Sequence, residues 1–139
     1  MPLGLRRLAK AIACAAVLAA VGKGAVATAV DQGDPWTVTV GPASRALYPG
    51  TDATMAYEVR NATSHSLHLQ GTTAVVRVRG GVDGCRDEWF RVGSNSVPTD
   101  VDVAPGEIMQ GSLVLVFDDA PVSQDACQNV GLDVVVTAS

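Results

Sequence analysis

Aspartates flank two cysteines in the C-terminal half of the chain, and they are the side chains best placed to do chemistry. The set is Asp83, Asp87, Asp118, Asp119 and Asp125. A bond between Cys85 and Cys127 would draw the two acidic segments together, and carboxylate oxygens on loops are the ligands that Ca²⁺ requires. Because their spacing matches no calcium-loop motif, solvated acidic loops are the simpler interpretation. Calcium binding is the alternative, with no other cofactor indicated.

The common catalytic motifs are absent from the sequence. It has no Gly-x-Ser-x-Gly elbow, no phosphate loop and no His-Glu-x-x-His pair. His65 and His68 are three residues apart, so on a strand they would point to opposite faces and would not readily chelate one ion. There is no third histidine to complete a zinc site. We therefore predict that the protein is not an enzyme and has no catalytic residues.

Trp89 and Arg91 are the candidates for an interaction surface, since aromatic residues are scarce in this chain. On a strand, Phe90 and Val92 would share one face and Trp89 and Arg91 the other. If Phe90 belongs to the core, Trp89 is exposed beside an arginine, and exposed tryptophans are common binding anchors. The alternative is that Trp89 covers a disulfide, as aromatic residues do in immunoglobulin-type sandwiches.

The N-terminal residues, 1–29, have the pattern of a secretory signal peptide. A positive segment precedes an apolar one over 11–21, and Ala27-Thr28-Ala29 fits the small-x-small cleavage signal. We expect a signal-peptide helix, cleavage after Ala29, and a secreted product that is extracellular or associated with the cell envelope. The apolar run is shorter than the roughly 20 residues of a spanning helix, which predicts no membrane insertion after cleavage. The positive residues are Arg6, Arg7 and Lys10.

Cleavage would change the charge and the cysteine count. The remaining 110 residues hold all 14 acidic residues but six of the ten basic ones, none of them lysine, so their net charge is −8. Such a surface repels nucleic acid and anionic lipid, and the partners we expect are a protein or an envelope glycan. Cys14 leaves with the signal. In an exported protein the remaining Cys85 and Cys127 usually pair; free thiols or a redox pair are the alternatives.

Beyond the signal, apolar and polar residues alternate with a period of two, which is typical of strands with one buried face. Turn sequences rich in Gly, Pro, Asn and Asp separate the segments. The pattern predicts an all-β protein: an antiparallel β-sandwich of about seven strands in one domain over 35–139, after a short flexible lead-in at 30–34. The alternating segments are 36–40, 53–60, 67–69, 74–79, 101–103, 113–117 and 132–137.

The alternation also predicts which side chains are buried, because a slip of one residue would move the whole apolar set to the solvent face. The expected core is Trp36, Val38, Met55, Tyr57, Val59, Val76, Leu113, Leu115, Phe117, Leu132, Val134 and Val136. The expected outward residues are Glu58, Arg60, Arg77, Asp102 and Asp133. Three further valines make their strands apolar on both faces, and an exposed stripe of them would mark a partner surface. They are Val114, Val116 and Val135.

Four turn and strand sequences occur in order along the chain: Leu47-Tyr48-Pro49-Gly50, Tyr57-Glu58-Val59-Arg60-Asn61, Val103-Ala104-Pro105-Gly106 and Asp125-Ala126-Cys127-Gln128. Together with the cysteine pair, they resemble a family of small secreted immunoglobulin-like domains from actinobacteria. The resemblance implies an immunoglobulin-like sandwich, although Ala62 stands where the family often has proline. It does not transfer a function.

From the missing catalytic motifs and a fold that displays loops, we expect a non-catalytic secreted or envelope-associated module that mediates protein or glycan interaction. The alternative is a calcium-binding secreted domain that uses the acidic loops around Cys85 and Cys127.

Overall fold

The computed structural model describes residues 15–20 and 35–139. The expected cleavage site and the 30–34 lead-in lie outside the described residues. Within the expected signal peptide, the described part is Ala15–Ala20, which forms strand β1 instead of a helix. Its residues favour a helix by propensity, but the edge of β9 (Gly131–Ala138) offers this segment a ladder of backbone hydrogen bonds. The rest of the expected signal-peptide helix lies outside the described residues, and the helix stays a prediction.

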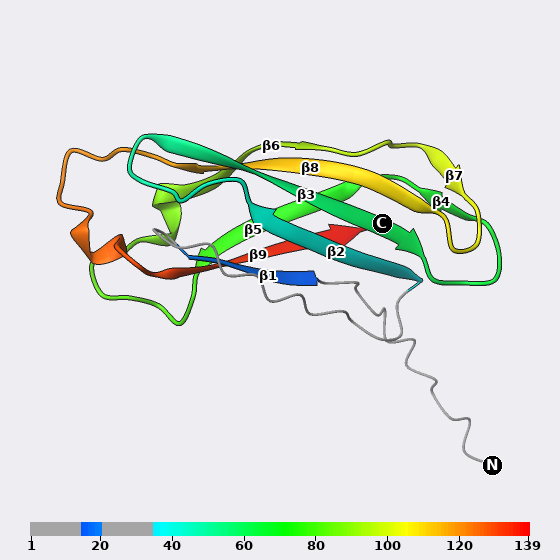
Figure 1. Cartoon of the computed structure of the whole chain (residues 1–139), viewed down its shortest axis with the longest axis horizontal. Coiled ribbons are helices and arrows are strands. Elements are labelled where there is room, and N and C mark those ends of the chain that lie inside the picture. Colours follow the sequence, from blue (N-terminus) through cyan, green and yellow to red (C-terminus); the bar gives the residue numbers. More distant parts are fainter. Residues whose placement is uncertain (1–14, 21–34) are drawn as a thin grey trace, which may run out of the picture.

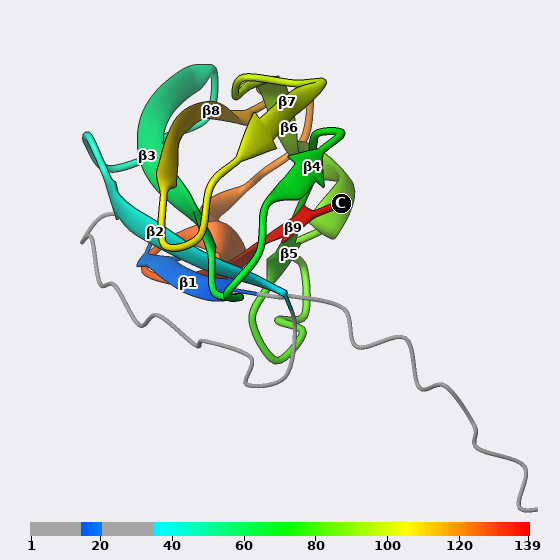
Figure 2. The same ribbon diagram turned by 90° about the vertical axis from the view of Figure 1, so that its right-hand side faces the viewer.

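Two antiparallel sheets form the body of the protein (Figure 1). The larger has the order β2-β3-β8-β6: β2 (Trp36–Ala43), β3 (Thr51–Asn61), β8 (Ile108–Phe117) and β6 (Phe90–Ser96). The smaller has the order β1-β9-β5, with β5 at Thr72–Val78. A short pair, β4 (Leu67–Leu69) and β7 (Val101–Val103), lies at one end, as Figure 2 also shows. Two single-turn 3₁₀ helices are η1 (Asp87–Trp89) and η2 (Asp125–Cys127). The predicted all-β antiparallel sandwich is confirmed.

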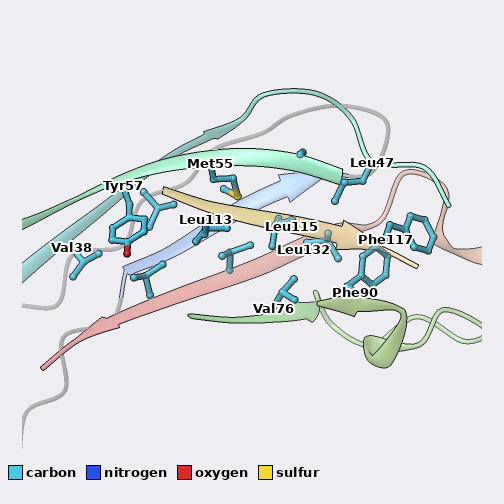
Figure 3. Packing of buried hydrophobic residues seen from close by; sticks show 14 of the residues in the cluster. Val38, Leu47, Met55, Tyr57, Val76, Phe90, Leu113, Leu115, Phe117 and Leu132 are labelled. Carbon is cyan, nitrogen blue, oxygen red and sulfur yellow. The ribbon is translucent and has the colours of Figure 1, made fainter. Parts of the chain in front are cut away.

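The core lies between the two sheets, and every residue predicted for it is buried. Met55 and Leu113, which are paired in the β3–β8 register, lie on the side of the larger sheet that faces the smaller sheet (Figure 3). At one end of the core the rings of Phe90 and Phe117 stack with their centroids 4.3 Å apart. Full burial of each such side chain stabilises the fold by about 1.5–3 kcal/mol, so the packing between the sheets is the main source of stability.

The outward-facing residues also follow the predicted register. Glu58, Arg60, Arg77 and Asp102 are exposed, and Asp133 is half-exposed. The three valines on the outer faces, Val114, Val116 and Val135, are half-buried, so they are neither covered nor arranged as a fully exposed stripe. Val75, which is half exposed, lies opposite Val135 in the β5–β9 register.

One strand of the larger sheet, β6, was not among the predicted segments. Its second half reads Gly93-Ser94-Asn95-Ser96, which lacks apolar alternation. The register with β8 shifts between Val92 and Ser94, and a Cβ at Gly93 would lie 2.9 Å from Val116 Cγ2. The strand therefore bends at a glycine that leaves room for a neighbouring side chain, and it is held by pairing with β8 and not by its own pattern.

A small polar network joins the two sheets within the core. The Tyr57 hydroxyl donates to Asn95 Oδ1 at 2.7 Å and shares a second hydrogen bond of 2.7 Å with Thr72 Oγ1. Asn95 Nδ2 in turn donates to Thr72 Oγ1 at 3.0 Å. Burial raises the pKa of the Tyr57 hydroxyl. A Cβ at Gly111 would lie 2.3 Å from Tyr57 Cζ, so the glycine makes the space that the ring occupies.

Candidate functional site: a groove beside the disulfide

Cys85 and Cys127 form a disulfide, with their Cα atoms 5.0 Å apart. The bond joins the segment between β5 and β6 to the segment between β8 and β9. Both cysteines are buried, and both are held in tight turns: the Cys85 N–H donates to the Val82 carbonyl at 3.0 Å and the Cys127 N–H to the Gln124 carbonyl at 2.9 Å. The predicted pairing is confirmed, and it fixes two long connections at one end of the sandwich.

A groove of about 510 Å³ lies on this end of the molecule, between the β2–β3 turn and the β8–β9 connection. Phe117 and Cys127 line it as buried residues, whereas Tyr48 and Val122 are 59% and 60% exposed. The groove has the volume of a small-ligand site. It thus combines a closed apolar floor with an aromatic and an aliphatic side chain that solvent reaches.

The Tyr48 turn is fixed to the end of β8. The Gly50 N–H donates to the Phe117 carbonyl at 2.7 Å, and the Thr51 N–H donates to the Tyr48 carbonyl at 2.9 Å. Gly50 has a φ of +78°, which a residue with a Cβ adopts only with strain. A Cβ there would also lie 3.7 Å from Asp119 Cβ, so the two walls of the groove approach each other at this point. The backbone that carries Tyr48 is therefore fixed against the end of β8.

The opposite wall is fixed by Gln124, a polar residue that is 7% exposed. Its Nε2 donates to the Asp118 carbonyl at 2.9 Å, and its Oε1 accepts from the Ala120 N–H at 3.0 Å. Both polar atoms of the buried Gln124 amide thus bond to earlier residues of the same connection between β8 and β9, and they hold it in a compact turn. Since the turn and this connection are both bonded internally, the groove is preorganised before any ligand arrives.

The structure brings together two of the predicted acidic residues and separates the others. Asp119 and Asp125 line the groove. Asp87 Oδ1 accepts from the Val78 N–H at 2.7 Å, and Asp118 accepts from Arg91 Nε at 2.9 Å. Asp83 is exposed in the turn before Cys85. In residues 15–20 and 35–139, no three His, Cys, Asp or Glu side chains are grouped so that they could hold a metal ion.

Trp89 and Arg91 lie outside the groove lining. The expectation that they share one face of a strand is wrong, because Trp89 is the last residue of η1 and the strand begins at Phe90. The Trp89 ring is half-buried against the core and lies 5.8 Å from the guanidinium carbon of Arg86. Arg91 is exposed and pairs with Asp118. Both side chains are therefore engaged within the molecule.

Groove residues missed at the sequence level include Tyr48, Val122, Gln128 and Asn129. The sequence did contain a signal for Tyr48. The following Pro-Gly places this aromatic residue on a turn, where its ring is expected to be exposed. The other three lie in a connection without periodic pattern. Their meeting with Tyr48 depends on the disulfide and on the pairing of β3 with β8, which are contacts between distant parts of the chain.

Comparisons with known proteins add little to this geometry. No protein-family model matches the chain, and no curated protein matches its sequence. Among solved structures it is similar to the envelope protein VP37 from White Spot Syndrome Virus, with a TM-score of 0.46 and 12% identity over 93% of this chain and 97% of that one. A likeness at this level carries no argument. Within the described residues, no helix has the length and apolar character needed to cross a membrane.

Proposed function

We propose that the protein is a non-catalytic, secreted or envelope-associated module of immunoglobulin-like type that binds an envelope glycan in the groove beside the disulfide. The observation that carries the proposal is the exposed Tyr48 ring, set on a rigid turn next to a preorganised pocket. An aromatic face gives the apolar face of a sugar ring a flat surface to pack on. The disulfide agrees with export, since such bonds persist in oxidising compartments.

The polar lining of the groove suits hydroxyl groups. Asp119 and Asp125 supply carboxylate acceptors, and Gln128 and Asn129 supply amides that both donate and accept. None of the described residues that line the groove is basic. A polyanionic ligand would therefore be repelled, and a neutral glycan or one with amino groups is favoured.

Binding to envelope polysaccharide tests this proposal. The exported protein is titrated calorimetrically with neutral oligosaccharides released from the envelope of the producing organism. Tyr48→Ala should weaken binding by about tenfold, because the loss of a stacked ring costs on the order of 1.4 kcal/mol. Ile108→Ala is the matched control, since Ile108 is 44% exposed but does not line the groove. Equal binding by the wild type and Tyr48→Ala contradicts the proposal.

Calcium binding stays a second candidate because Asp119 and Asp125 line the same groove. A ligand that binds only the native state raises the midpoint of thermal unfolding. For the calcium-binding function, millimolar Ca²⁺ must raise the midpoint, a chelator must lower it, and Asp119→Asn with Asp125→Asn must abolish the difference. If neither Ca²⁺ nor the chelator changes the midpoint of thermal unfolding, the calcium-binding function is rejected and the glycan proposal is unaffected.

A further inference from the structure

Strand β9 is a central strand of the smaller sheet only because β1 covers one of its edges. β1 pairs with β9 antiparallel along its whole length, from Ala15 opposite Val136 to Ala20 opposite Gly131. The other edge of β9 pairs with β5. Since Ala15–Ala20 lie inside the segment that we expect to be removed on export, cleavage after Ala29 would take β1 away and leave β9 at the edge of the sheet.

An edge at β9 would be unusually open to another strand. Unpaired backbone N–H and C=O groups on an edge strand are a template for further pairing, and proteins commonly blunt such edges with lysine, proline or a bulge. β9 reads Gly-Leu-Asp-Val-Val-Val-Thr-Ala, contains neither lysine nor proline, and keeps a continuous register with both neighbours. Its one charged residue, Asp133, forms an ion pair with Arg79 at 3.2 Å. Its central valines are among the residues with the strongest preference for extended structure.

The space that β1 occupies is a slot between the two sheets and not only an open edge. β1 also contacts β2 of the larger sheet, and Figure 2 shows it beside both strands. β2 carries Pro42 and shifts its register between Val40 and Ala43, so this wall is a poor partner for a regular ladder. Leu132, Val134 and Val136 of β9 are completely buried with β1 in place. An incoming strand would therefore hydrogen-bond to β9 and help to cover the core.

The chemistry of the occupant follows from β1 itself, whose sequence is Ala-Ala-Val-Leu-Ala-Ala. It is a short run of small and branched aliphatic residues without charge, and its backbone pairs antiparallel with β9. We propose that the β9 edge of the exported protein is a strand-acceptor site that binds such an aliphatic segment of a partner protein, in the place that β1 holds in the uncleaved chain. Recognition by strand addition draws affinity from main-chain hydrogen bonds and specificity from alternate side chains.

The test compares the uncleaved chain with the exported protein, whose N-terminus is first determined by mass spectrometry. The probe is a synthetic peptide of residues 15–20 with a Gly-Lys-Lys tail for solubility. Hydrogen exchange is followed at the β9 amides by NMR. In the exported protein the amides on the β1 side should exchange fast, and saturating peptide should slow them by roughly tenfold or more. In the uncleaved chain they should be slow without peptide. A peptide with proline in place of Val17 is the control and should protect nothing.

Three results overturn the proposal. One is an exported chain that still contains residues 15–20. Another is β9 protection that is the same in both forms and unaffected by the peptide. The third is protection that rises with the concentration of the exported protein alone, which would make a second copy the occupant. None of these results bears on the groove, because the slot between β9 and β2 shares no residue with its lining.

Discussion

The two ends of the sandwich are closed by different means, and the difference explains where a ligand can bind. At the end where β3 begins, a covalent bond between Cys85 and Cys127 holds the connections. At the end where β3 finishes (Figure 1), Asn61 closes the sandwich. Its side chain is completely buried. The disulfide itself uses no polar side-chain atoms, and Tyr48 and Val122 near it stay exposed to solvent.

At the Asn61 end, every polar atom of the asparagine side chain is engaged. Asn61 Nδ2 donates to the carbonyls of His65 and Val103 at 2.8 and 2.9 Å. Its Oδ1 accepts from both the N–H and the hydroxyl of Thr63 at 2.9 and 2.7 Å. The Asn61-Ala62-Thr63 triplet is thus a structural turn. This end is closed by hydrogen bonds that leave little for a ligand, whereas the disulfide end exposes Tyr48 beside a groove.

Loss of the disulfide should give the largest effect on stability. The double variant Cys85→Ser with Cys127→Ser should lose roughly 2–5 kcal/mol of unfolding free energy, the usual cost for a small secreted domain. Urea denaturation of this variant and the wild type measures the change. The loss of stability should also be local. Backbone amides of the groove segment 119–129 should lose hydrogen-exchange protection, whereas amides near Asn61 should keep theirs. Uniform loss at both ends would contradict the proposed division of roles.

Asn61→Ala should cost about 2–3 kcal/mol, because four hydrogen bonds disappear and the carbonyl of the buried Val103 loses its 2.9 Å donor. Asn61→Asp separates hydrogen bonding from packing. It keeps the shape of the side chain but places an oxygen against the carbonyls of His65 and Val103, so it should be destabilised at neutral pH as well. If the Asn61→Asp variant has the same urea-denaturation midpoint as the wild type, the amide of Asn61 acts only by filling space.

The fold could be largely predicted from the sequence, since burial on one face of a strand leaves a period-two record in the residues themselves. The groove could not. Gln124 looks like any polar loop residue, and its burial depends on a connection that folds back on Asp118 and Ala120. Strand β6 was missed for the same reason: Gly93 and Asn95 are explained by Val116 and Tyr57, which lie on other strands. The local sequence pattern predicts which residues are buried, but it does not predict which residues from distant parts of the chain cover them.

Gln124→Ala should have an intermediate effect. It removes two hydrogen bonds from a buried amide and leaves the Ala120 N–H and the Asp118 carbonyl without partners, at a cost of about 1–2 kcal/mol. Gln110→Ala is the matched control. The Gln110 amide bonds to Glu58 Oε1 at 3.0 Å on the exposed face, so its loss should change stability by less than about 0.5 kcal/mol. Thermal melts of the two variants should differ clearly, and equal melts would mean that Gln124 does not support the groove wall.

The smallest expected effect is a pH dependence at the Asn61 end. His68 of β4 lies opposite Asp102 of β7, with Nδ1 and Oδ1 2.8 Å apart, and Asp100 Oδ1 lies 3.8 Å from Nε2. The hydrogen bond to Asp102 raises the pKa of His68, and both carboxylates add to the rise through their charge. Because the folded state binds this proton more tightly than the unfolded chain does, the pair stabilises the fold fully below the ordinary histidine pKa of about 6.5. That contribution is lost as the pH rises through the higher folded-state value.

The melting temperature of the wild type should therefore exceed that of His68→Gln by more at pH 5.5 than at pH 8.5. His65→Gln is the control, since His65 is exposed and its side chain has no carboxylate within ion-pairing distance among the described residues. The difference should shrink in high salt, because exposed charges are screened. A wild-type advantage that is equal at both pH values would mean that the His68–Asp102 contact is a neutral hydrogen bond. In that case the His68–Asp102 contact would resemble the hydrogen bonds of Asn61. This end of the sandwich would then be closed without any contribution from charge.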